Sequence, residues 1–320
     1  MAAKPRILAT RRLPPNVTAR LERDYDATLN AEDEIWSSDT LVAKAAGHDG
    51  ILCCSSEKFT PAVIDALPQS VRILATFSVG YEHIDVDAAK RRGLTVTNTP
   101  DVLTDATADV AMLCLLGAAR RGAEGDRMVR EGRWTAWHTT MMLGTHVGGK
   151  RLGIFGMGRI GRAVARRARG FGMEIHYHNR SRLAPELEEG ATYHETPEAL
   201  LEVSEFLSIN APSSPDTVKF LDAERIARLP RGAVVVNTAR GNMVDDEALV
   251  AALRSGRVAA AGLDVFDGEP NINPAYRELD NTFLLPHLGS ATHETRDAMG
   301  YCCLDNLDAF FAGKPCPTAL

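Results

Sequence analysis

The sequence lacks the features of a membrane or secreted protein. No run of about 18 consecutive apolar residues occurs among its 320 residues, so no membrane-spanning helix is expected. The basic residues between Lys4 and Arg12 are not followed by the apolar segment of a signal peptide. The six cysteines form no CxxC pair, which argues against a disulfide framework or a zinc site. We therefore expect a soluble, cytoplasmic protein with reduced thiols.

The sequence also lacks a basic excess and any metal-ligand pattern. It carries 36 basic and 42 acidic residues, a net charge of -6, and it shows no basic stripe. A nucleic-acid partner is therefore not expected. The nine histidines show no ligand spacing, so we expect no metal. With 45% apolar residues, a chain of this length favours two cores and hence two domains.

Short apolar runs alternate with helical patterns along the chain. The helical patterns include residues 39–46, 61–67 and 246–255, the last with Asp245 as N-cap and Gly256 as stop signal. Strands separated by helices predict an α/β fold with doubly wound parallel sheets. The predicted strands are residues 7–9, 50–53, 73–76, 152–155, 174–177, 206–209, 233–237, 260–264 and 283–285. Two further long helices are predicted at 104–120 and about 292–312, and residues 124–149 read as a polar connection.

A glycine-rich loop gives the sharpest local signal. Gly156-Met157-Gly158-Arg159-Ile160-Gly161 follows the predicted strand 152–155 and opens a helix at 160–169. Glycines at this position permit a tight turn and let the backbone approach a pyrophosphate, which the free amides of the helix N-terminus then bind. The motif in this setting predicts a dinucleotide site.

The end of the next strand indicates which dinucleotide is bound. An NAD site places an acid there to hold the ribose hydroxyls, but residues 176–181 contain none. Asn179, Arg180 and Ser181 stand there instead, and such donors attract a 2'-phosphate that a carboxylate would repel. We therefore expect NADP(H), with NAD as the alternative.

Several segments, in this order, make the chain resemble the D-isomer-specific 2-hydroxyacid dehydrogenase family over nearly its whole length. Besides the Gly156 loop they are 78–85 (SVGYEHID), 237–241 (NTARG), 262–266 (GLDVF), 269–270 (EP) and 286–292 (PHLGSAT). Within the family the chain is most similar to the glyoxylate/hydroxypyruvate reductases, through 98–104 (NTPDVLT), the Trp134/Trp137 stretch and 179–181.

The resemblance implies a catalytic triad of Arg240, Glu269 and His287. Arg240 and His287 each follow a predicted strand, at the carboxyl edge where α/β sites lie. The arginine fork suits a 2-keto acid, a histidine can give a proton to the carbonyl oxygen, and a carboxylate beside it would orient the imidazole and favour its protonated form.

The resemblance also implies the remaining contacts of substrate and cofactor. The substrate would be bound by the backbone of Val79 and Gly80, by Arg240 and by Ser290. Besides the residues of the Gly156 loop and the next strand end, the implied cofactor positions are Thr107, Ala211, Pro212, Thr238, Ala239, Asp264 and Gly289.

The fold class expected is therefore α/β, with two Rossmann-like doubly wound parallel-sheet domains and a cleft between them. Residues 1–99 and 288–320 would form the substrate domain and 100–287 the dinucleotide-binding domain. The implied enzyme is an NADPH-preferring reductase of glyoxylate or hydroxypyruvate, working as a homodimer with the Trp134–Leu143 stretch as a contact. The alternatives are a D-lactate-like or phosphoglycerate-like dehydrogenase, or a nucleotide-sensing binding protein without activity.

Overall fold

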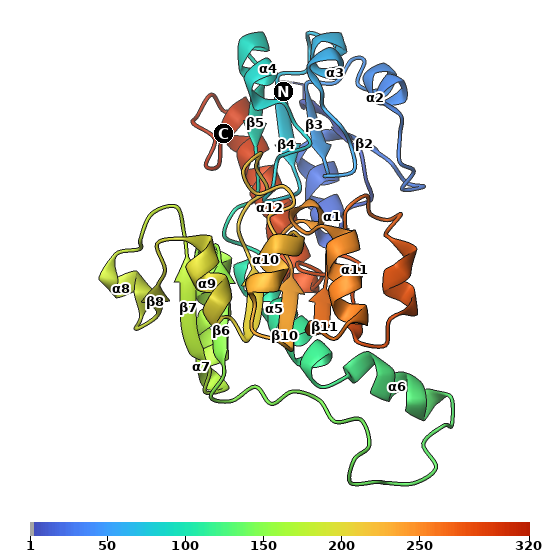
Figure 1. Cartoon of the computed structure of the whole chain (residues 1–320). Coiled ribbons are helices and arrows are strands. Elements are labelled where there is room, and N and C mark those ends of the chain that lie inside the picture. The colour runs from blue at the N-terminus through green and yellow to red at the C-terminus, as the bar shows by residue number, and fades with distance from the viewer. Residues whose placement is uncertain (1–2) are drawn as a thin grey trace. The chain divides into compact units, whose positions relative to one another are not determined.

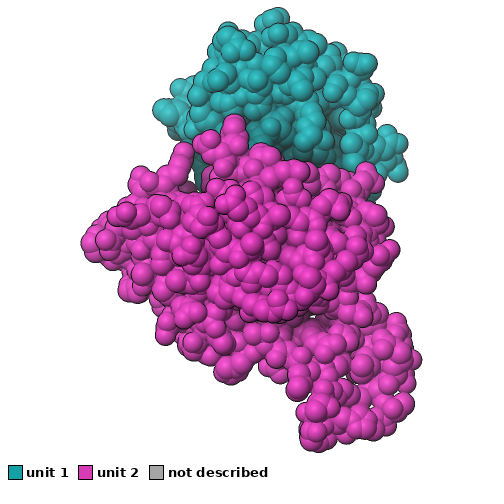
Figure 2. All heavy atoms as spheres, viewed as in Figure 1, with its two compact units in different colours: residues 1–103, 291–320 teal, residues 104–290 magenta. Residues whose placement is uncertain are grey.

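The computed structural model describes residues 3–320, which form two compact units (Figure 2). Unit 1 combines the chain up to Leu103 with Ala291–Leu320, and unit 2 is Thr104–Ser290. The sequence predicts boundaries between a substrate domain and a cofactor domain after residues 99 and 287. The chain leaves the first compact unit after Leu103 and the second after Ser290.

Unit 1 contains a five-stranded parallel sheet in the order β2-β1-β3-β4-β5 (Figure 1). Its strands are β1 (Arg6–Ala9), β2 (Asp26–Leu29), β3 (Gly50–Cys53), β4 (Ile73–Thr76) and β5 (Thr95–Thr97). Its helices are α1 (Pro15–Asp24), α2 (Ser38–Lys44), α3 (Pro61–Ala66), α4 (Val86–Arg92) and α12 (His293–Phe311). The last helix, α12, returns late in the chain to contact β4 and α1.

Unit 2 contains a seven-stranded parallel sheet in the order β12-β11-β10-β9-β6-β7-β8. Its strands are β6 (Arg151–Phe155), β7 (Glu174–His178), β8 (Thr192–Tyr193), β9 (Phe206–Ile209), β10 (Ala233–Asn237), β11 (Val258–Leu263) and β12 (Thr282–Leu284). Its α-helices are α5 (Thr104–Ala119), α6 (Gly122–Arg130), α7 (Arg159–Gly170), α8 (Pro185–Glu188), α9 (Pro197–Val203), α10 (Ala223–Arg228) and α11 (Asp246–Arg254). Two short 3-10 helices, η1 (Gly241–Met243) and η2 (Pro274–Glu278), follow β10 and precede β12.

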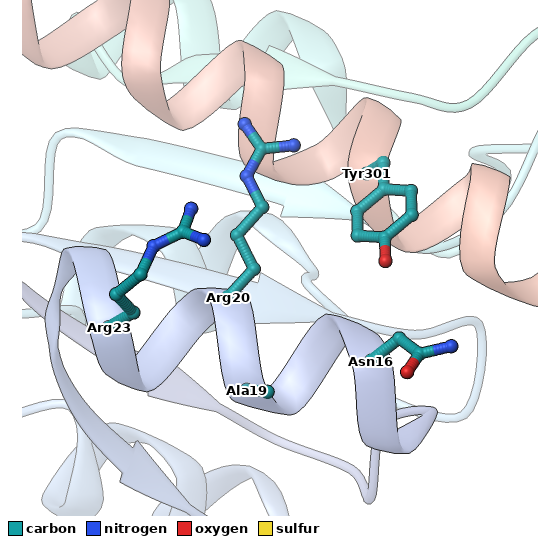
Figure 3. Close-up of a pocket in the computed structure, with 5 residues that line it drawn as sticks. All are labelled: Asn16, Ala19, Arg20, Arg23 and Tyr301. Atoms are coloured by element: carbon teal, nitrogen blue, oxygen red, sulfur yellow. The ribbon is translucent and has the colours of Figure 1, made fainter.

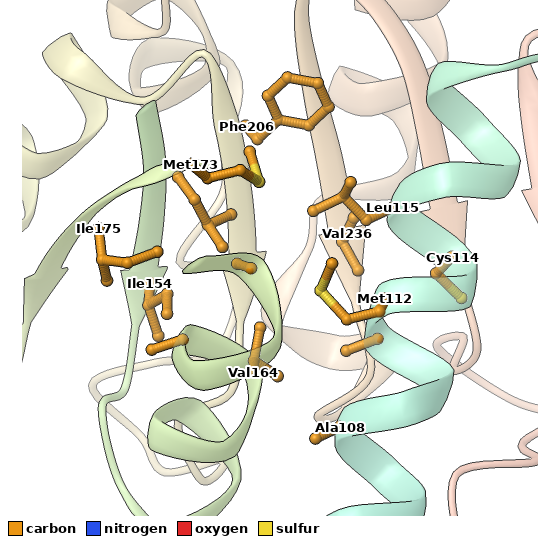
Figure 4. Packing of buried hydrophobic residues seen from close by; sticks show 14 of the residues in the cluster. Ala108, Met112, Cys114, Leu115, Ile154, Val164, Met173, Ile175, Phe206 and Val236 are labelled. Carbon is orange, nitrogen blue, oxygen red and sulfur yellow. The ribbon is translucent and has the colours of Figure 1, made fainter. Parts of the chain in front are cut away.

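Helices α5 and α7 cover one face of the unit 2 sheet. Side chains of α5 such as Met112 and Leu115 lie against Val236 of β10, while Val164 of α7 lies near Ile154 of β6 (Figure 4). Because α5 contacts both the sheet and α7, its apolar residues extend around much of its circumference.

The structure corrects the sequence interpretation at two places in unit 2. The predicted polar connection from residue 124 begins inside a helix, because α6 spans Gly122–Arg130. No side chain of α6 is buried, so its sequence does not carry the buried apolar stripe from which a helix is predicted. The predicted strand 260–264 is β11, which begins earlier, at Val258, and ends at Leu263. Asp264 therefore stands just beyond the strand, at the carboxyl edge of the sheet.

Candidate functional site

A histidine and a glutamate form a close pair beyond the carboxyl ends of β11 and β12. Nδ1 of His287 lies 2.5 Å from Oε1 of Glu269. Because a carboxylate only accepts, the Nδ1–H of the imidazole donates this bond. The His287 side chain is 48% exposed, and within residues 3–320 its Nε2 has no hydrogen-bond partner. The imidazole is therefore held at one nitrogen and accessible at the other.

The surroundings of Glu269 keep its carboxylate ionised. Burial acts to raise the pKa of Glu269, but the hydrogen bond from His287 and the amide of Phe266, 3.0 Å from Oε2, outweigh it. The positive charge of Arg240 acts in the same direction, and the pKa of Glu269 lies below its ordinary value. At neutral pH this carboxylate is therefore a charged acceptor for the Nδ1–H of the imidazole.

Asp264 holds the turn that carries His287. The amide of His287 donates to the Asp264 carbonyl at 2.9 Å, and the amides of Leu288 and Gly289 donate to its two carboxylate oxygens at 2.6 and 2.9 Å. His287 has φ 56, a left-handed conformation that costs a non-glycine residue free energy. Burial raises the pKa of Asp264, and the two amide bonds act against it. The sequence analysis missed this contact; an acid directly after a buried strand is the signal for it.

Arg240 lies in a second turn, after β10. Buried Asn237 fixes this turn, because its Nδ2 donates to the Arg240 carbonyl at 2.9 Å and its Oδ1 accepts from the Ala239 amide at 3.0 Å. A Cβ placed on Gly241 would lie 1.8 Å from the carbonyl carbon of Phe266. Only glycine permits this approach, which brings the turn of Arg240 against the segment leading to Glu269.

The glycine loop after β6 has the geometry of a phosphate cradle. Gly156 has φ +96, and a Cβ there would lie 2.4 Å from the Ala211 amide nitrogen. A Cβ on Gly161 would lie 2.3 Å from the Gly156 carbonyl, so this glycine lets α7 approach the strand. At Gly158 nothing lies within 4 Å of the Cβ position, so the backbone is open to a ligand.

The cradle lies where the strand order reverses, between β6 and β9, which is where open α/β sheets bind ligands. Arg159 and Ile160 open α7 directly after it. Beside it, Asn179 Oδ1 accepts from the Met157 amide at 2.6 Å and so braces the loop. Arg180 and Ser181 follow with exposed side chains.

The remaining candidate residues of unit 2 lie along the same edge. Thr107 of α5 is buried, and its side chain lies 3.5 Å from the Cβ position of Gly289. The Oγ1 of Thr238 is buried and has no partner among the described residues. Ala211 and Pro212 follow β9, and Ser290 ends the unit.

Val79 and Gly80 belong to unit 1. They follow β4 in a loop that Ser78 and Asn98 fix, with Oγ donating to the Gly80 carbonyl at 2.7 Å and Nδ2 to the Val79 carbonyl at 2.8 Å. The structure thus groups the predicted unit 2 residues at one sheet edge, and it places the predicted carboxylate-binding loop in the other unit.

A hollow of about 600 Å³ elsewhere on unit 1 does not have the chemistry of an anion site. It lies between α1 and α12, lined by Asn16, Ala19, Arg20, Arg23 and Tyr301 (Figure 3). The Arg20 guanidinium lies 2.7 Å from both Asp305 and Asp308, so its charge is already compensated.

Residues 3–320 contain no cluster of three or more histidine, cysteine, aspartate or glutamate side chains able to hold a metal ion. In that same range no helix has the length and apolarity to cross a membrane.

Comparison with known proteins agrees with this arrangement. Residues 112–289 match the model of the D-isomer specific 2-hydroxyacid dehydrogenase NAD binding domain. The chain is 45% identical to a glycerate dehydrogenase of Hyphomicrobium methylovorum, covering 99% of both chains. It is 43% identical to a glyoxylate reductase of Thermococcus onnurineus, covering 98% of this chain and 95% of the relative.

A solved structure extends the likeness to three dimensions. An NADPH-dependent glyoxylate/hydroxypyruvate reductase of Sinorhizobium meliloti, in complex with NADP and malonate, superimposes with a TM-score of 0.90 at 36% identity. The match covers 99% of this chain and 97% of that one. The chain therefore belongs to the D-isomer-specific 2-hydroxyacid dehydrogenase family, and it is an NAD(P)-dependent oxidoreductase.

Proposed function

We propose that the protein reduces glyoxylate and hydroxypyruvate to glycolate and D-glycerate, with a preference for NADPH. The observation that carries this proposal is the pair of His287 and Glu269, 2.5 Å apart and within the electrostatic reach of Arg240. His287 can donate a proton, and the Glu269 carboxylate favours the charged form of the imidazole. The forked guanidinium of Arg240 can bind two oxygens of a 2-keto acid. The glyoxylate and glycerate relatives support the choice of substrate.

Each residue of the proposed triad has one role in the reduction. The Arg240 guanidinium binds the substrate through its carboxylate and keto oxygens, and the backbone amides of Val79 and Gly80 bind the carboxylate. As the keto π bond breaks and a C–H bond forms at carbon 2, Nε2 of His287 gives its proton to the oxygen. Glu269 holds the imidazole in the orientation that points Nε2 outward. Ser290, three residues after His287, is proposed as a further substrate contact.

The glycine cradle fits a nicotinamide dinucleotide, which would supply the hydride when bound. The open Cβ position at Gly158 and the unpartnered buried Oγ1 of Thr238 support this fit. We propose that Gly156, Gly158, Arg159, Ile160 and Gly161 hold the pyrophosphate. The ribose and its 2'-phosphate would be held by Asn179, Arg180 and Ser181. The remaining proposed contacts are Thr107, Ala211, Pro212, Thr238, Ala239, Asp264 and Gly289.

The preference for NADPH rests on the exposed guanidinium of Arg180. No carboxylate stands beside it at residues 177–182 to repel a 2'-phosphate. A hydrogen bond to a charged group contributes about 1.5–3 kcal/mol, which corresponds to a preference of roughly tenfold to a hundredfold.

We also propose that the protein is a homodimer. Helix α6 and the segment after it extend away from the unit 2 sheet (Figure 1). Large apolar side chains are exposed along them, namely Val129, Trp134, Trp137 and Leu143. Exposed apolar patches of this kind mark protein interfaces, and a second copy would cover them.

The experiment that tests the proposed reaction is a panel of steady-state assays. Glyoxylate, hydroxypyruvate and pyruvate are each assayed with NADPH and with NADH. The proposal predicts the highest kcat/KM with NADPH and either glyoxylate or hydroxypyruvate. Turnover of pyruvate alone would contradict the assigned substrates, and no turnover with any pair would contradict the reaction itself.

A further inference from the structure

The segment that follows α12 adds to an edge of the unit 1 sheet. Ala319 forms an antiparallel bridge with Thr97 of β5, and the Leu320 amide donates to the Val96 carbonyl at 3.0 Å. The end of the chain therefore lies beside β5 (Figure 1). Pairing with an open sheet edge accounts for these backbone contacts. It does not account for the side-chain contacts that Thr318 makes next to them.

Thr318 joins this segment to Asn98, the residue that follows β5. The Oγ1 of Thr318 donates to the Asn98 carbonyl at 2.6 Å, and the Thr318 carbonyl accepts from the Asn98 amide at 3.3 Å. The thiol of Cys302, a weak donor, lies 3.7 Å from the same Asn98 carbonyl oxygen. Asn98 is buried, and Thr318 binds both polar groups of its backbone.

Helix α12 in turn fixes Thr318 through Asn306, which is fully buried. The Nδ2 of Asn306 donates to Thr318 Oγ1 at 2.8 Å and to the Cys302 carbonyl at 2.7 Å, and its Oδ1 accepts from the Thr318 amide at 3.1 Å. Because the Thr318 hydroxyl accepts from Asn306, its own hydrogen is directed to the Asn98 carbonyl. Three hydrogen bonds in series thus lead from α12 to Asn98.

The side chain of Asn98 extends this series to the proposed carboxylate-binding loop. Its Nδ2 donates to the Val79 carbonyl at 2.8 Å. A trans peptide unit is planar, so the Val79 carbonyl and the Gly80 N–H point in opposite directions. The bond from Asn98 therefore also fixes the direction of the Gly80 N–H. Within residues 3–320 neither the Val79 amide nor the Gly80 amide donates a hydrogen bond, so both can bind an anion.

We propose that Thr318 is a positioning residue of the substrate site. By holding Asn98 it fixes the direction of the Gly80 amide, and this direction sets the affinity for the substrate carboxylate. The inference rests on the proposed function, in which the backbone of Val79 and Gly80 binds that carboxylate. Thr318 acts through Asn98 and is assigned no contact with substrate or cofactor.

The test compares Thr318→Val, which removes the hydroxyl and keeps a similar shape, with Thr318→Ser, which keeps the hydroxyl. The assay uses glyoxylate at saturating NADPH. The loss of one neutral hydrogen bond should raise the KM for glyoxylate roughly two- to tenfold in Thr318→Val, and Thr318→Ser should stay below about twofold. The carboxylate is bound alike in the ground and transition states, so kcat should stay nearly unchanged. The KM for NADPH should not change, because the proposed cofactor residues belong to unit 2.

A double-mutant cycle tests whether Thr318 acts through Asn98. Asn98→Ala removes the donor to the Val79 carbonyl, so it should raise the KM for glyoxylate at least as much as Thr318→Val. Adding Thr318→Val to Asn98→Ala should then raise this KM little further, because both changes release the same amide. Independent, additive effects on the KM would contradict the proposed series of hydrogen bonds.

The control is Thr28→Val, a matched substitution at the opposite edge of the same sheet. Thr28 lies on β2, and its Oγ1 is 2.8 Å from Nε2 of His48. This control should lower the Tm and leave the KM for glyoxylate unchanged. If Thr318 served stability alone, Thr318→Val would behave like the control, with a lower Tm and an unchanged KM.

The outcomes separate this inference from the proposed function. A raised KM for glyoxylate in Thr318→Val, restored in Thr318→Ser and absent in the Asn98→Ala background, supports it. An unchanged KM in Thr318→Val contradicts it while the wild type still turns over glyoxylate. A wild type that reduces no 2-keto acid contradicts the proposed function and this inference together.

Discussion

At the scale of single residues, the imidazole of His287 depends on two carboxylates with different tasks. Glu269 accepts from the side chain, and Asp264 accepts from the backbone of the same turn. The first holds the imidazole in its orientation, a task that the family resemblance implies. The second stabilises the left-handed backbone at φ 56, and this task is not visible from the spacing of these residues in the sequence.

Replacing Glu269 by Gln tests the first task through pH dependence. The pKa of Glu269 is lowered, so its carboxylate is charged at neutral pH and favours the imidazolium. Without that charge the imidazole loses its proton at a lower pH. Reduction consumes this proton, so kcat/KM for glyoxylate should decline at a lower pH in Glu269→Gln than in the wild type. A pH profile identical to that of the wild type would contradict the role of the pair.

Replacing Arg240 by Lys tests the substrate clamp. Lysine keeps the charge but has no fork, so it binds the carboxylate and keto oxygens less well. We expect KM to rise and kcat to fall, with kcat/KM for glyoxylate lowered roughly 10- to 100-fold. Steady-state kinetics check this, and wild-type values would show that Arg240 does not contact the substrate.

At the scale of elements, the glycines of the loop between β6 and α7 allow an effect on stability to be separated from an effect on cofactor binding. Gly161→Ala would place a Cβ 2.3 Å from the Gly156 carbonyl, so the helix must shift and the Tm should fall. Gly158→Ala meets nothing within 4 Å, so its Tm should stay near that of the wild type. Its NADPH affinity should nonetheless weaken, because the methyl group would occupy the space where the pyrophosphate approaches. Unchanged NADPH affinity in Gly158→Ala, measured by calorimetry, would argue against a pyrophosphate there.

The end of β7 sets the expected cofactor choice. Arg180→Ala removes the cation proposed to bind the 2'-phosphate, so most of the preference for NADPH should disappear while kcat/KM with NADH stays nearly constant. Arg182→Ala is the matched control, because Arg182 already donates to Glu188 at 2.8 Å. Equal use of both cofactors by the wild type would mean that this strand end does not recognise the phosphate.

The elements differ in how far the sequence predicts them. The buried strands β3, β4, β9 and β10 have the predicted bounds, because a continuous apolar run is buried on both faces. The strands not predicted, β2, β5 and β8, all lie at sheet edges, and neither β2 nor β8 buries a side chain. The N-cap predicted at Asp245 is confirmed, since its side chain accepts from the Ala248 amide.

The site was predictable to the extent that it lies at strand ends. Gly156 follows directly after strand β6, and Arg240 lies three residues beyond the end of β10, so their edge of the sheet could be inferred. The support that Asn237 gives to the turn of Arg240 could not be inferred, because it depends on contacts in the folded structure. An asparagine ending a strand is a weak signal without that structure.

At the scale of the whole molecule, the proposed dimer accounts for the exposed apolar side chains of unit 2. Trp137 is 72% exposed, and such a residue is costly to leave in water. Replacing Trp134 and Trp137 by Ser should shift the protein from dimer to monomer in sedimentation at micromolar concentration. Phe171→Ser, an exposed apolar residue next to α7, is the control and should stay dimeric. A monomeric wild type would contradict the proposed interface.

His287 is the proposed proton donor in the reduction of a 2-keto acid, and the whole mechanism depends on this role. The most direct measurement is kcat for glyoxylate with saturating NADPH in His287→Ala, with the NADPH Kd measured in parallel and exposed His146→Ala as control. General acid catalysis contributes about 10²- to 10⁴-fold, so kcat should fall by that factor while the Kd stays nearly unchanged. A variant that keeps more than half of the wild-type kcat would contradict the claim.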